Sequence, residues 1–339
     1  MSCVPFFYYA SPIYWIDDDP IFLQAFSYCL KENFEIKSIL DPHEALKFFS
    51  NYQPPHKASA FLQACEDHEE YDLPDHLPVD FDFKLLRNLR HSSKKQKDIP
   101  VIIIDYKMPG MTGIELAEKL KAMSAKKILL TGMSDLQIAV DAFNKGLIDC
   151  FICKDNPNLD QELQNQIKRL QRQYFIDRST PLLDHLESGF RLPQSDPAFS
   201  AFFEKLCLEK NIIEYYLSDK NGGMLLVNSE GITQYLMIHT DRTLNEFIDL
   251  YENDTEHTFF LQSIKNRTKI PCFTPDDKEP WELKVSEWSN YFSSPNLLKG
   301  RENYYWSLIN PENISAKSKA RKFSATKITG NVLSISGIN

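Results

Sequence analysis

Residues 101–110 read Val-Ile-Ile-Ile-Asp-Tyr-Lys-Met-Pro-Gly, an apolar run that ends on Asp105 and is followed by a turn. A short continuous apolar run bounded by turn residues is typical of a buried strand in a parallel sheet. Three other apolar runs also stop at a polar side chain, and these residues are Asp17, Thr131 and Lys154. Ligands of an open parallel sheet bind beyond the carboxyl ends of the strands. We therefore expect the four strand ends to form one site.

The first half of the chain alternates strand-like and helix-like segments. Apolar positions in residues 159–178 recur every three or four residues, which predicts a helix with one buried face. Two pairs have the spacing of a capping box at a helix start, Thr112 with Glu115 and Ser134 with Gln137. Five strand–helix repeats predict a parallel sheet with helices on both faces.

The residue types at the four strand ends suit phosphoryl chemistry. Acidic residues Asp17, Asp18 and Asp105 can together hold a hard divalent cation. The Thr131 hydroxyl and the Lys154 ammonium can hold phosphoryl oxygens. The sequence therefore predicts a site at which Asp105 receives a phosphoryl group.

The chain resembles the receiver domain of two-component response regulators. The residues that carry the resemblance, in chain order, are Asp17, Asp18, Asp105, the run Met108-Pro109-Gly110, Thr131, Phe151 and Lys154. The resemblance implies a flavodoxin-like α/β fold in which a sensor histidine kinase phosphorylates Asp105. It also implies Mg²⁺ bound by Asp17, Asp18, Asp105 and the backbone carbonyl of Lys107. Lys154 would pair with the phosphoryl oxygens, while Thr131 and Phe151 would switch position and transmit the signal.

Two features depart from the family pattern. Receivers usually place a proline after the lysine, but here Asp155 follows Lys154. The distance from Asp18 to Asp105 is 105 − 18 = 87 residues, about twice that of the family, and the excess lies in residues 51–98. This insertion precedes the third strand and is acidic first, then basic and helical in pattern. It is either a partner surface or an elaboration that packs on the receiver.

The pattern changes after the receiver segment. We expect a receiver domain over residues 1–178 and a linker rich in proline and glycine over 179–196. Residues 197–310 predict an atypical α+β output domain with an antiparallel sheet. We expect residues 311–339 to be a basic, flexible tail, because they hold five basic residues against one acidic residue, so 5 − 1 = +4.

Composition limits the classes of function. The net charge of −9 argues against a chain that coats nucleic acid, although a local basic patch stays open. No apolar stretch is long enough to span a bilayer. Seven scattered cysteines suggest reduced thiols and hence a cytoplasmic protein. We expect a phosphoacceptor and not an enzyme, with autophosphatase activity and an enzymatic output domain left open.

The architecture also resembles that of quorum-sensing response regulators of Legionella. That resemblance implies control of gene expression and a homodimer that forms on phosphorylation. The output domain has two readings. It is a module that binds nucleic acid or protein, or it is a small-ligand sensor or enzyme with a pocket lined by Tyr215, Tyr216, Trp281 or Trp288. The sequence does not identify the kinase or the target.

Overall fold

The computed structural model describes residues 3–55, 58–64, 79–186, 192–252, 258–275 and 288–310. These residues form two compact units, each with its own sheet. Among the described residues, the first unit comprises 10–55 and 92–178, and the second comprises 3–9, 58–91 and 179–310.

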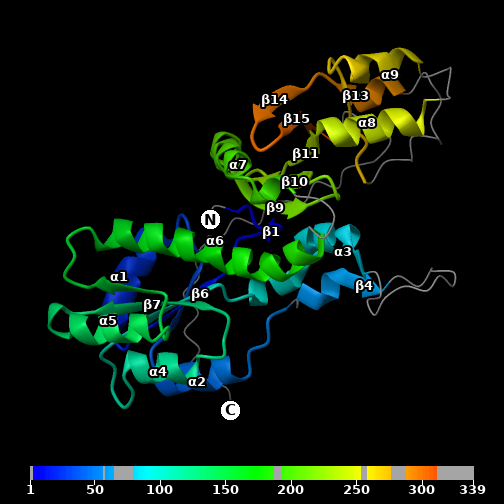
Figure 1. Cartoon of the computed structure of the whole chain (residues 1–339). Helices are drawn as coiled ribbons and strands as arrows, with labels where there is room; N and C mark the ends of the chain where they lie inside the picture. The colour runs from blue at the N-terminus through cyan, green and yellow to red at the C-terminus, as the bar shows by residue number, and fades with distance from the viewer. Residues whose placement is uncertain are drawn as a thin grey trace. The chain divides into compact units, whose positions relative to one another are not determined.

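A five-stranded parallel sheet with the strand order β3-β2-β6-β7-β8 forms the centre of the first unit (Figure 1). Its central strand β6 is buried along its whole length, which explains its uninterrupted apolar sequence. The strands are β2 (Ile13–Ile16), β3 (Ile36–Ile39), β6 (Val101–Asp105), β7 (Lys126–Thr131) and β8 (Cys150–Cys153). The expected receiver fold is thus confirmed.

Helices cover both faces of this sheet. One apolar core lies between the sheet and α1 with α6, and a second lies between the sheet and α2, α4 and α5 (Figure 1). The helices are α1 (Pro20–Leu30), α2 (Pro42–Ser50), α4 (Gly113–Lys119), α5 (Leu136–Asn144) and α6 (Leu159–Leu186). The expected stripe on α6 is confirmed, since Leu163, Ile167, Leu170 and Tyr174 are buried.

Local sequence explains where these helices begin. The side chains of Asp19 and Asp41 cap α1 and α2, and a proline at the first helical position follows each. Thr112 and Glu115 form the expected capping box of α4. The second expected box is wrong, because α5 begins at Leu136 and its N-cap residue makes no side-chain capping bond.

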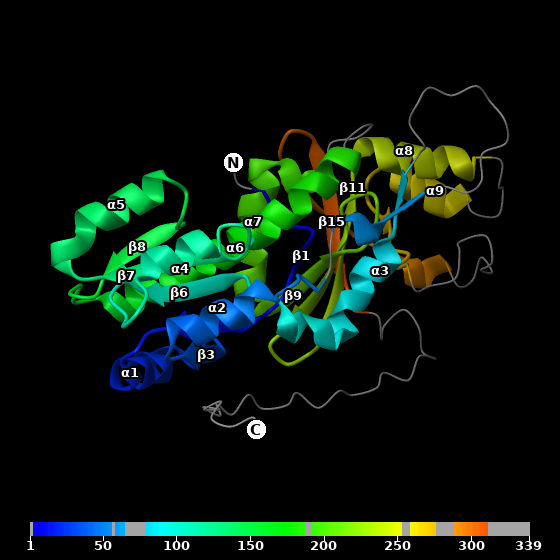
Figure 2. The same cartoon turned by 90° about the horizontal axis from the view of Figure 1, so that it is seen from below.

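The second unit contains an antiparallel sheet with the strand order β1-β9-β10-β11-β15-β14 (Figure 2). Its strands are β1 (Phe7–Tyr8), β9 (Ile212–Leu217), β10 (Met224–Asn228), β11 (Thr233–His239), β14 (Asn296–Lys299) and β15 (Asn303–Ile309). The expected second α+β unit with an antiparallel sheet is confirmed.

Among its described residues, the second unit also contains four α-helices and two small antiparallel sheets of two strands each. Helix α3 packs against β9, α7 packs against β9 and β14, and α8 and α9 lie side by side (Figure 2). The helices are α3 (Phe83–Asn88), α7 (Pro197–Glu209), α8 (Asp241–Leu250) and α9 (Thr258–Lys265). The two-stranded sheets pair β4 (Leu62–Ala64) with β5 (Val79–Phe81), and β12 (Ile270–Pro271) with β13 (Phe292–Ser293).

The structure corrects the expected boundaries of the receiver. Strand β1 pairs with β9, so the N-terminal residues belong to the second sheet. The described part of the insertion from Ala58 to His91 also belongs to the second unit, where Arg87 Nη1 donates to the carbonyl of Ser218 at 2.8 Å. No local sequence pattern marks the β1–β9 pairing or the contact between Arg87 and Ser218, because the two partners in each case are far apart in the sequence. The acidic part of the insertion lies outside the described residues.

The expected linker is also wrong in part. Helix α6 continues through Pro181 to Leu186, a turn at Pro193–Ser195 follows, and α7 begins at Pro197. Within the part of the chain that the structure describes, no helix combines the length and the apolar composition needed to cross a bilayer. Trp281 and the basic tail lie outside the described residues.

Candidate functional site

Four polar residues meet at the carboxyl edge of the five-stranded sheet, as the sequence predicted. Asp17 follows β2, Asp105 and Thr131 end the neighbouring strands β6 and β7, and Lys154 follows β8. The strand register fixes this meeting, because Asp105 lies beside Leu130, the residue before Thr131. The backbone N–H of Lys154 donates to the carbonyl of Thr131 at 2.8 Å.

Lys154 joins two of the acidic side chains. Its Nζ lies 2.8 Å from Asp17 Oδ2 and 2.9 Å from Asp105 Oδ1. Both carboxylates are buried, with 1% and 7% of the side chain exposed, whereas 25% of the Lys154 side chain is exposed. The ammonium also lies 4.4 Å from the centre of the Phe22 ring, which supports it through a cation–π contact. Lys154 is thus held at the position from which it can meet a group on Asp105.

The acidic residues fit a divalent cation. Ligand atoms of Asp17, Asp18 and Asp105 lie within 4.8 Å of one another. Three carboxylates against one ammonium leave a local charge of −3 + 1 = −2, which one divalent cation would neutralise. Asp18 is exposed, so a cation held there would keep bound water, as Mg²⁺ commonly does in proteins. The chemistry of the donor set therefore fits Mg²⁺.

Burial and pairing shift the acid–base behaviour of the site. Burial raises the pKa of the Asp105 carboxyl above its ordinary value, and the hydrogen bond from Lys154 offsets this only in part. Burial lowers the pKa of Lys154, but its hydrogen bonds to Asp17 and Asp105 outweigh burial and raise that pKa overall. The site is therefore an acidic group in low-dielectric surroundings beside a firmly protonated lysine.

Asp19, the third residue of the acidic run, has a structural role. Its Oδ1 accepts hydrogen bonds from the backbone N–H groups of Ile21 and Phe22, at 2.9 and 3.1 Å. Its own N–H donates to Asp17 Oδ1 at 3.0 Å. Asp19 therefore caps α1 and orients Asp17, and it is not one of the three clustered ligands.

Gly113 is a residue that the sequence analysis missed. A Cβ atom at this position would lie 2.2 Å from the backbone oxygen of Asp105, which is closer than real atoms approach. The N–H of Gly113 donates to the carbonyl of Tyr106 at 2.9 Å. The start of α4 thus packs directly on the backbone of the proposed phosphoacceptor. Gly110, in the turn before it, has φ +78°, which favours glycine.

The two proposed switch residues have different surroundings. Thr131 is buried, and its hydroxyl donates to the carbonyl of Gly132 at 3.3 Å. Phe151 is half-buried and meets the exposed Phe143 ring edge to face at 6.4 Å. It lines an open hollow of about 280 Å³ together with Phe143, Asp149, Cys150, Gln166 and Arg169. An inward turn of Phe151 would change this hollow.

Lys107, whose carbonyl was the expected fourth ligand, lies in the loop after β6. Its side chain points to solvent, with 68% exposed, and its Nζ lies 2.7 Å from Asp135. Asp155, which replaces the usual proline, accepts a hydrogen bond from the N–H of Met133 at 3.2 Å.

A separate charged cluster precedes β6, at the opposite end of the strand. Asp98 is fully buried and accepts hydrogen bonds from Tyr174 at 2.6 Å, Arg178 at 2.6 Å and Tyr52 at 3.0 Å. Tyr174 and Arg178 come from α6, and Tyr52 lies two residues after the end of α2. Because every member is satisfied, we interpret the cluster as structural.

Comparison with known proteins agrees with this geometry. The family model described as response regulator receiver domain matches residues 84–168. The transcriptional regulatory protein DesR of Bacillus subtilis (strain 168) is 30% identical over 138 residues, which cover 37% of this chain and 65% of DesR. The chain thus spans less than two thirds of that relative. These findings identify a response regulator receiver domain in this part of the chain.

The similarity extends further in one solved structure. The structure of the Legionella pneumophila response regulator LqsR matches with a TM-score of 0.73 and 27% sequence identity. The match covers 90% of this chain and 89% of that one. It therefore includes both units of the fold and confirms the expected resemblance to a Legionella response regulator.

Proposed function

We propose that a sensor histidine kinase phosphorylates Asp105 and that phosphorylation switches the protein between two states of assembly. The observation that carries the proposal is the buried Asp105 carboxylate, held beside Lys154 at 2.9 Å and clustered with Asp17 and Asp18. A purely structural ion pair would not need a third, exposed carboxylate at the same point. The match to the receiver domain model supports this reading.

The transfer reaction follows from the groups present. A carboxylate oxygen of Asp105 attacks phosphorus, the bond from phosphorus to the kinase histidine nitrogen breaks, and that nitrogen keeps the electron pair. Lys154 holds the transferred phosphoryl oxygens as a point charge. Mg²⁺ held by Asp17, Asp18, Asp105 and the Lys107 carbonyl would cancel the repulsion between the two anions. The product is an acyl phosphate on Asp105.

The added charge would then act on Thr131 and Phe151. A phosphoryl group adds about −1.5 to −2 charges near neutral pH. The Thr131 hydroxyl, at the end of the adjacent strand, would turn to donate to it. Phe151 would follow into the space released and change the face formed by α5, β8 and α6. This face carries the exposed side chains of Ile138 and Phe143, which suit a two-fold dimer.

The test is sedimentation velocity of the full chain with and without acetyl phosphate and Mg²⁺. We expect a monomer-to-dimer shift that Asp105→Asn abolishes. Phe143→Ser should weaken the dimer, whereas Phe48→Ser should not, although the two rings are equally exposed at 47% and 46%. Phosphate incorporation without any change in sedimentation would refute the assembly switch and leave the phosphoacceptor assignment standing.

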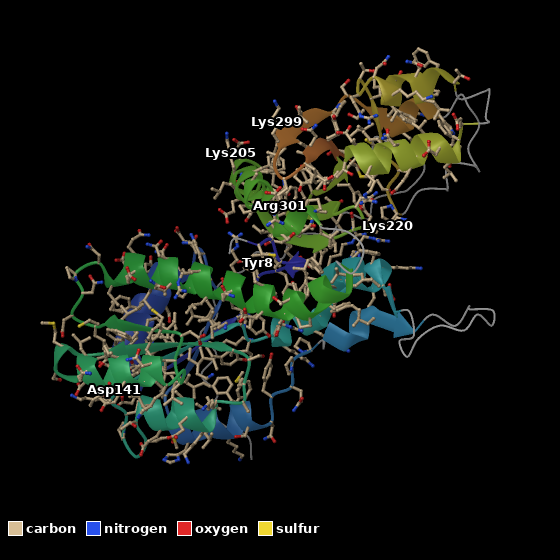
Figure 3. All side chains as sticks on the ribbon, in the orientation of Figure 1. Tyr8, Asp141, Lys205, Lys220, Lys299 and Arg301 are labelled. Atoms are coloured by element: carbon tan, nitrogen blue, oxygen red, sulfur yellow. The ribbon has the colours of Figure 1, made fainter. Side chains whose placement is uncertain are left out.

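For the output unit we propose regulation of gene expression, in a quorum-sensing circuit, by contact with nucleic acid phosphates. Helix α7 packs against β14, and Lys205, Lys299 and Arg301 are labelled on this side of the unit (Figure 3). The name of the curated relative, a transcriptional regulatory protein, supports the same direction. The pocket reading is less supported, because Tyr215, Tyr216 and Trp288 are buried core residues.

This output proposal has its own test. Fluorescence anisotropy with a DNA duplex should show binding that weakens steeply with salt, since phosphate contacts release counterions. Charge reversal at Lys205, Lys299 and Arg301 should abolish the binding. Charge reversal at Lys220, which lies in a different part of the unit, should not (Figure 3). Equal loss in both variants would overturn the assignment of this face.

A further inference from the structure

Strand β14 forms one edge of the antiparallel sheet in the second unit. It stands last in the strand order, and within the described residues it pairs with β15 alone (Figure 1). The register sets Leu297 opposite Tyr305 and Lys299 opposite Asn303. An edge strand presents a row of backbone donors and acceptors to which another strand can pair.

The register shows which backbone groups of β14 point outward. The N–H of Gly300 donates to the carbonyl of Glu302 at 3.0 Å. Hydrogen-bonded and non-hydrogen-bonded pairs alternate along an antiparallel ladder, so Leu298 bonds to β15, whereas Leu297 and Lys299 turn their N–H and C=O groups away from it. In the part of the chain that the structure describes, no hydrogen bond reaches these outward groups. β14 therefore offers two donors and two acceptors in one row.

The side chains of β14 leave this edge open to pairing. Sheet edges are commonly protected by prolines, bulges or charged side chains. β14 reads Asn-Leu-Leu-Lys, so it contains no proline, and its register with β15 has no shift. Leu297 is 50% exposed, and Lys299 is the one charged side chain of the strand. A single lysine therefore opposes pairing, and only in a register that sets it against a like charge.

A second copy of β14 fits this row in one antiparallel register. When two copies meet about a two-fold axis through Leu298, Leu297 of each copy lies opposite Lys299 of the other. All the outward donors and acceptors are then paired in four backbone hydrogen bonds, and each lysine stem can cover an exposed leucine. The neighbouring registers fit less well, because one sets Lys299 opposite its own copy and the other sets it opposite Pro295, which has no N–H to donate.

We propose that two copies of the chain pair through β14, with Leu298 on the two-fold axis, and so join their antiparallel sheets into one. The contact uses the second unit alone and depends on neither phosphorylation nor nucleic acid. Four backbone hydrogen bonds with little side-chain burial make it weak, with a dissociation constant of about 1 mM. Copies held together by a second contact reach an effective concentration in this range, at which the strands pair.

The test is sedimentation equilibrium of the full chain carrying Asp105→Asn, at protein concentrations up to about 1 mM. Asp105→Asn removes the dimer that phosphorylation would drive, so the remaining association reports on β14. Leu297→Pro removes one outward N–H per copy and leaves the bonds of Leu298 to β15 in place, and proline is tolerated on edge strands. It should weaken association by about fivefold or more. Leu297→Val keeps the N–H and should change association by less than about twofold.

Charge variants test the register. Leu297→Glu sets a carboxylate opposite Lys299 of the other copy, twice in each dimer, and should strengthen association about three- to tenfold. Leu297→Lys sets like charges opposite each other and should weaken association by a similar factor. When Leu297→Lys is combined with Lys299→Glu, the two charges exchange places and association should recover. High salt should reduce the difference between Leu297→Glu and Leu297→Lys, since salt screens the pairs.

The outcomes decide for or against the β14 contact. No association of the Asp105→Asn chain at about 1 mM would overturn the proposal. Equal association of Leu297→Glu and Leu297→Lys would also overturn it, because the copies would then meet through another surface. Recovery in the charge exchange supports the register even where Leu297→Pro does not fold. None of these results bears on the phosphoacceptor assignment, since Asp105 is replaced in every chain compared.

Discussion

Replacing Lys154 by methionine removes the ammonium group that pairs with Asp17 and Asp105. Methionine keeps most of the side-chain volume, so the loss is mainly electrostatic. Breaking a buried ion pair lowers the free energy of unfolding by about 3–5 kcal/mol. Because a quarter of the lysine side chain is exposed to solvent, we expect Lys154→Met to lower it by about 2 kcal/mol. In a unit of this size that corresponds to a drop of about 8 °C in the midpoint of thermal unfolding.

The pH dependence of this loss has a definite sign. The pKa of Asp105 is raised in the folded state, so its contribution to stability is present below its unfolded pKa and is lost as pH rises through the folded pKa. Lys154 lowers the pKa of Asp105, so removal of the ammonium raises that pKa further. The loss of stability from ionising Asp105 then continues to higher pH in the variant. The variant should therefore approach the wild type at about pH 4, near the ordinary pKa of an aspartic acid, and differ most near neutral pH.

Magnesium should compensate for the missing charge. In Lys154→Met the three acidic ligands no longer share their charge with an ammonium, so Mg²⁺ should bind more tightly and stabilise the variant more than the wild type. Calorimetry with and without Mg²⁺ identifies the receiver transition as the one that the ion shifts. Lys121→Met, at an exposed position, is the control. Equal stabilisation of variant and wild type by Mg²⁺ would refute the reasoning.

Three further substitutions test other parts of the receiver unit. Asp98→Ala leaves Arg178 and two tyrosines without their acceptor and should cost about 3–5 kcal/mol in urea unfolding; a loss below about 1 kcal/mol would contradict the buried cluster. Gly113→Ala should lower the free energy of unfolding by about 1–3 kcal/mol, because the new Cβ displaces the Asp105 backbone. For the same reason it should weaken Mg²⁺ binding, which calorimetric titration would measure. Asp19→Ala should cost about 1 kcal/mol through loss of the α1 cap yet leave uptake of phosphate intact, and loss of phosphorylation in a folded variant would show that Asp19 is a ligand.

The receiver sheet could be predicted because its signals are local. Each strand is a short apolar run, and parallel pairing forces the polar residue after each run to the same edge. The sequence therefore predicts the shared site without knowledge of any contact. Its residues are Asp17, Asp105, Thr131 and Lys154. Their meeting is a consequence of strand direction alone.

The remaining features depend on contacts that the sequence does not display. Strand β1 is two residues long and pairs with a strand about two hundred residues away, so no local pattern marks it. Helix α6 passes Pro181 although proline normally ends a helix, hence the expected linker began too early. Gly113 looks like any helix-start glycine until its distance to the Asp105 backbone is known.

The central claim is that Asp105 is the phosphoacceptor. The most direct measurement treats the full chain with acetyl phosphate and Mg²⁺, reduces the acyl phosphate with borohydride and maps the peptides by mass spectrometry. The account predicts that residue 105 alone is converted to homoserine, that omission of Mg²⁺ prevents this, and that Asp105→Asn shows no conversion. Conversion at another acidic residue, or none in the folded wild type, would contradict the account.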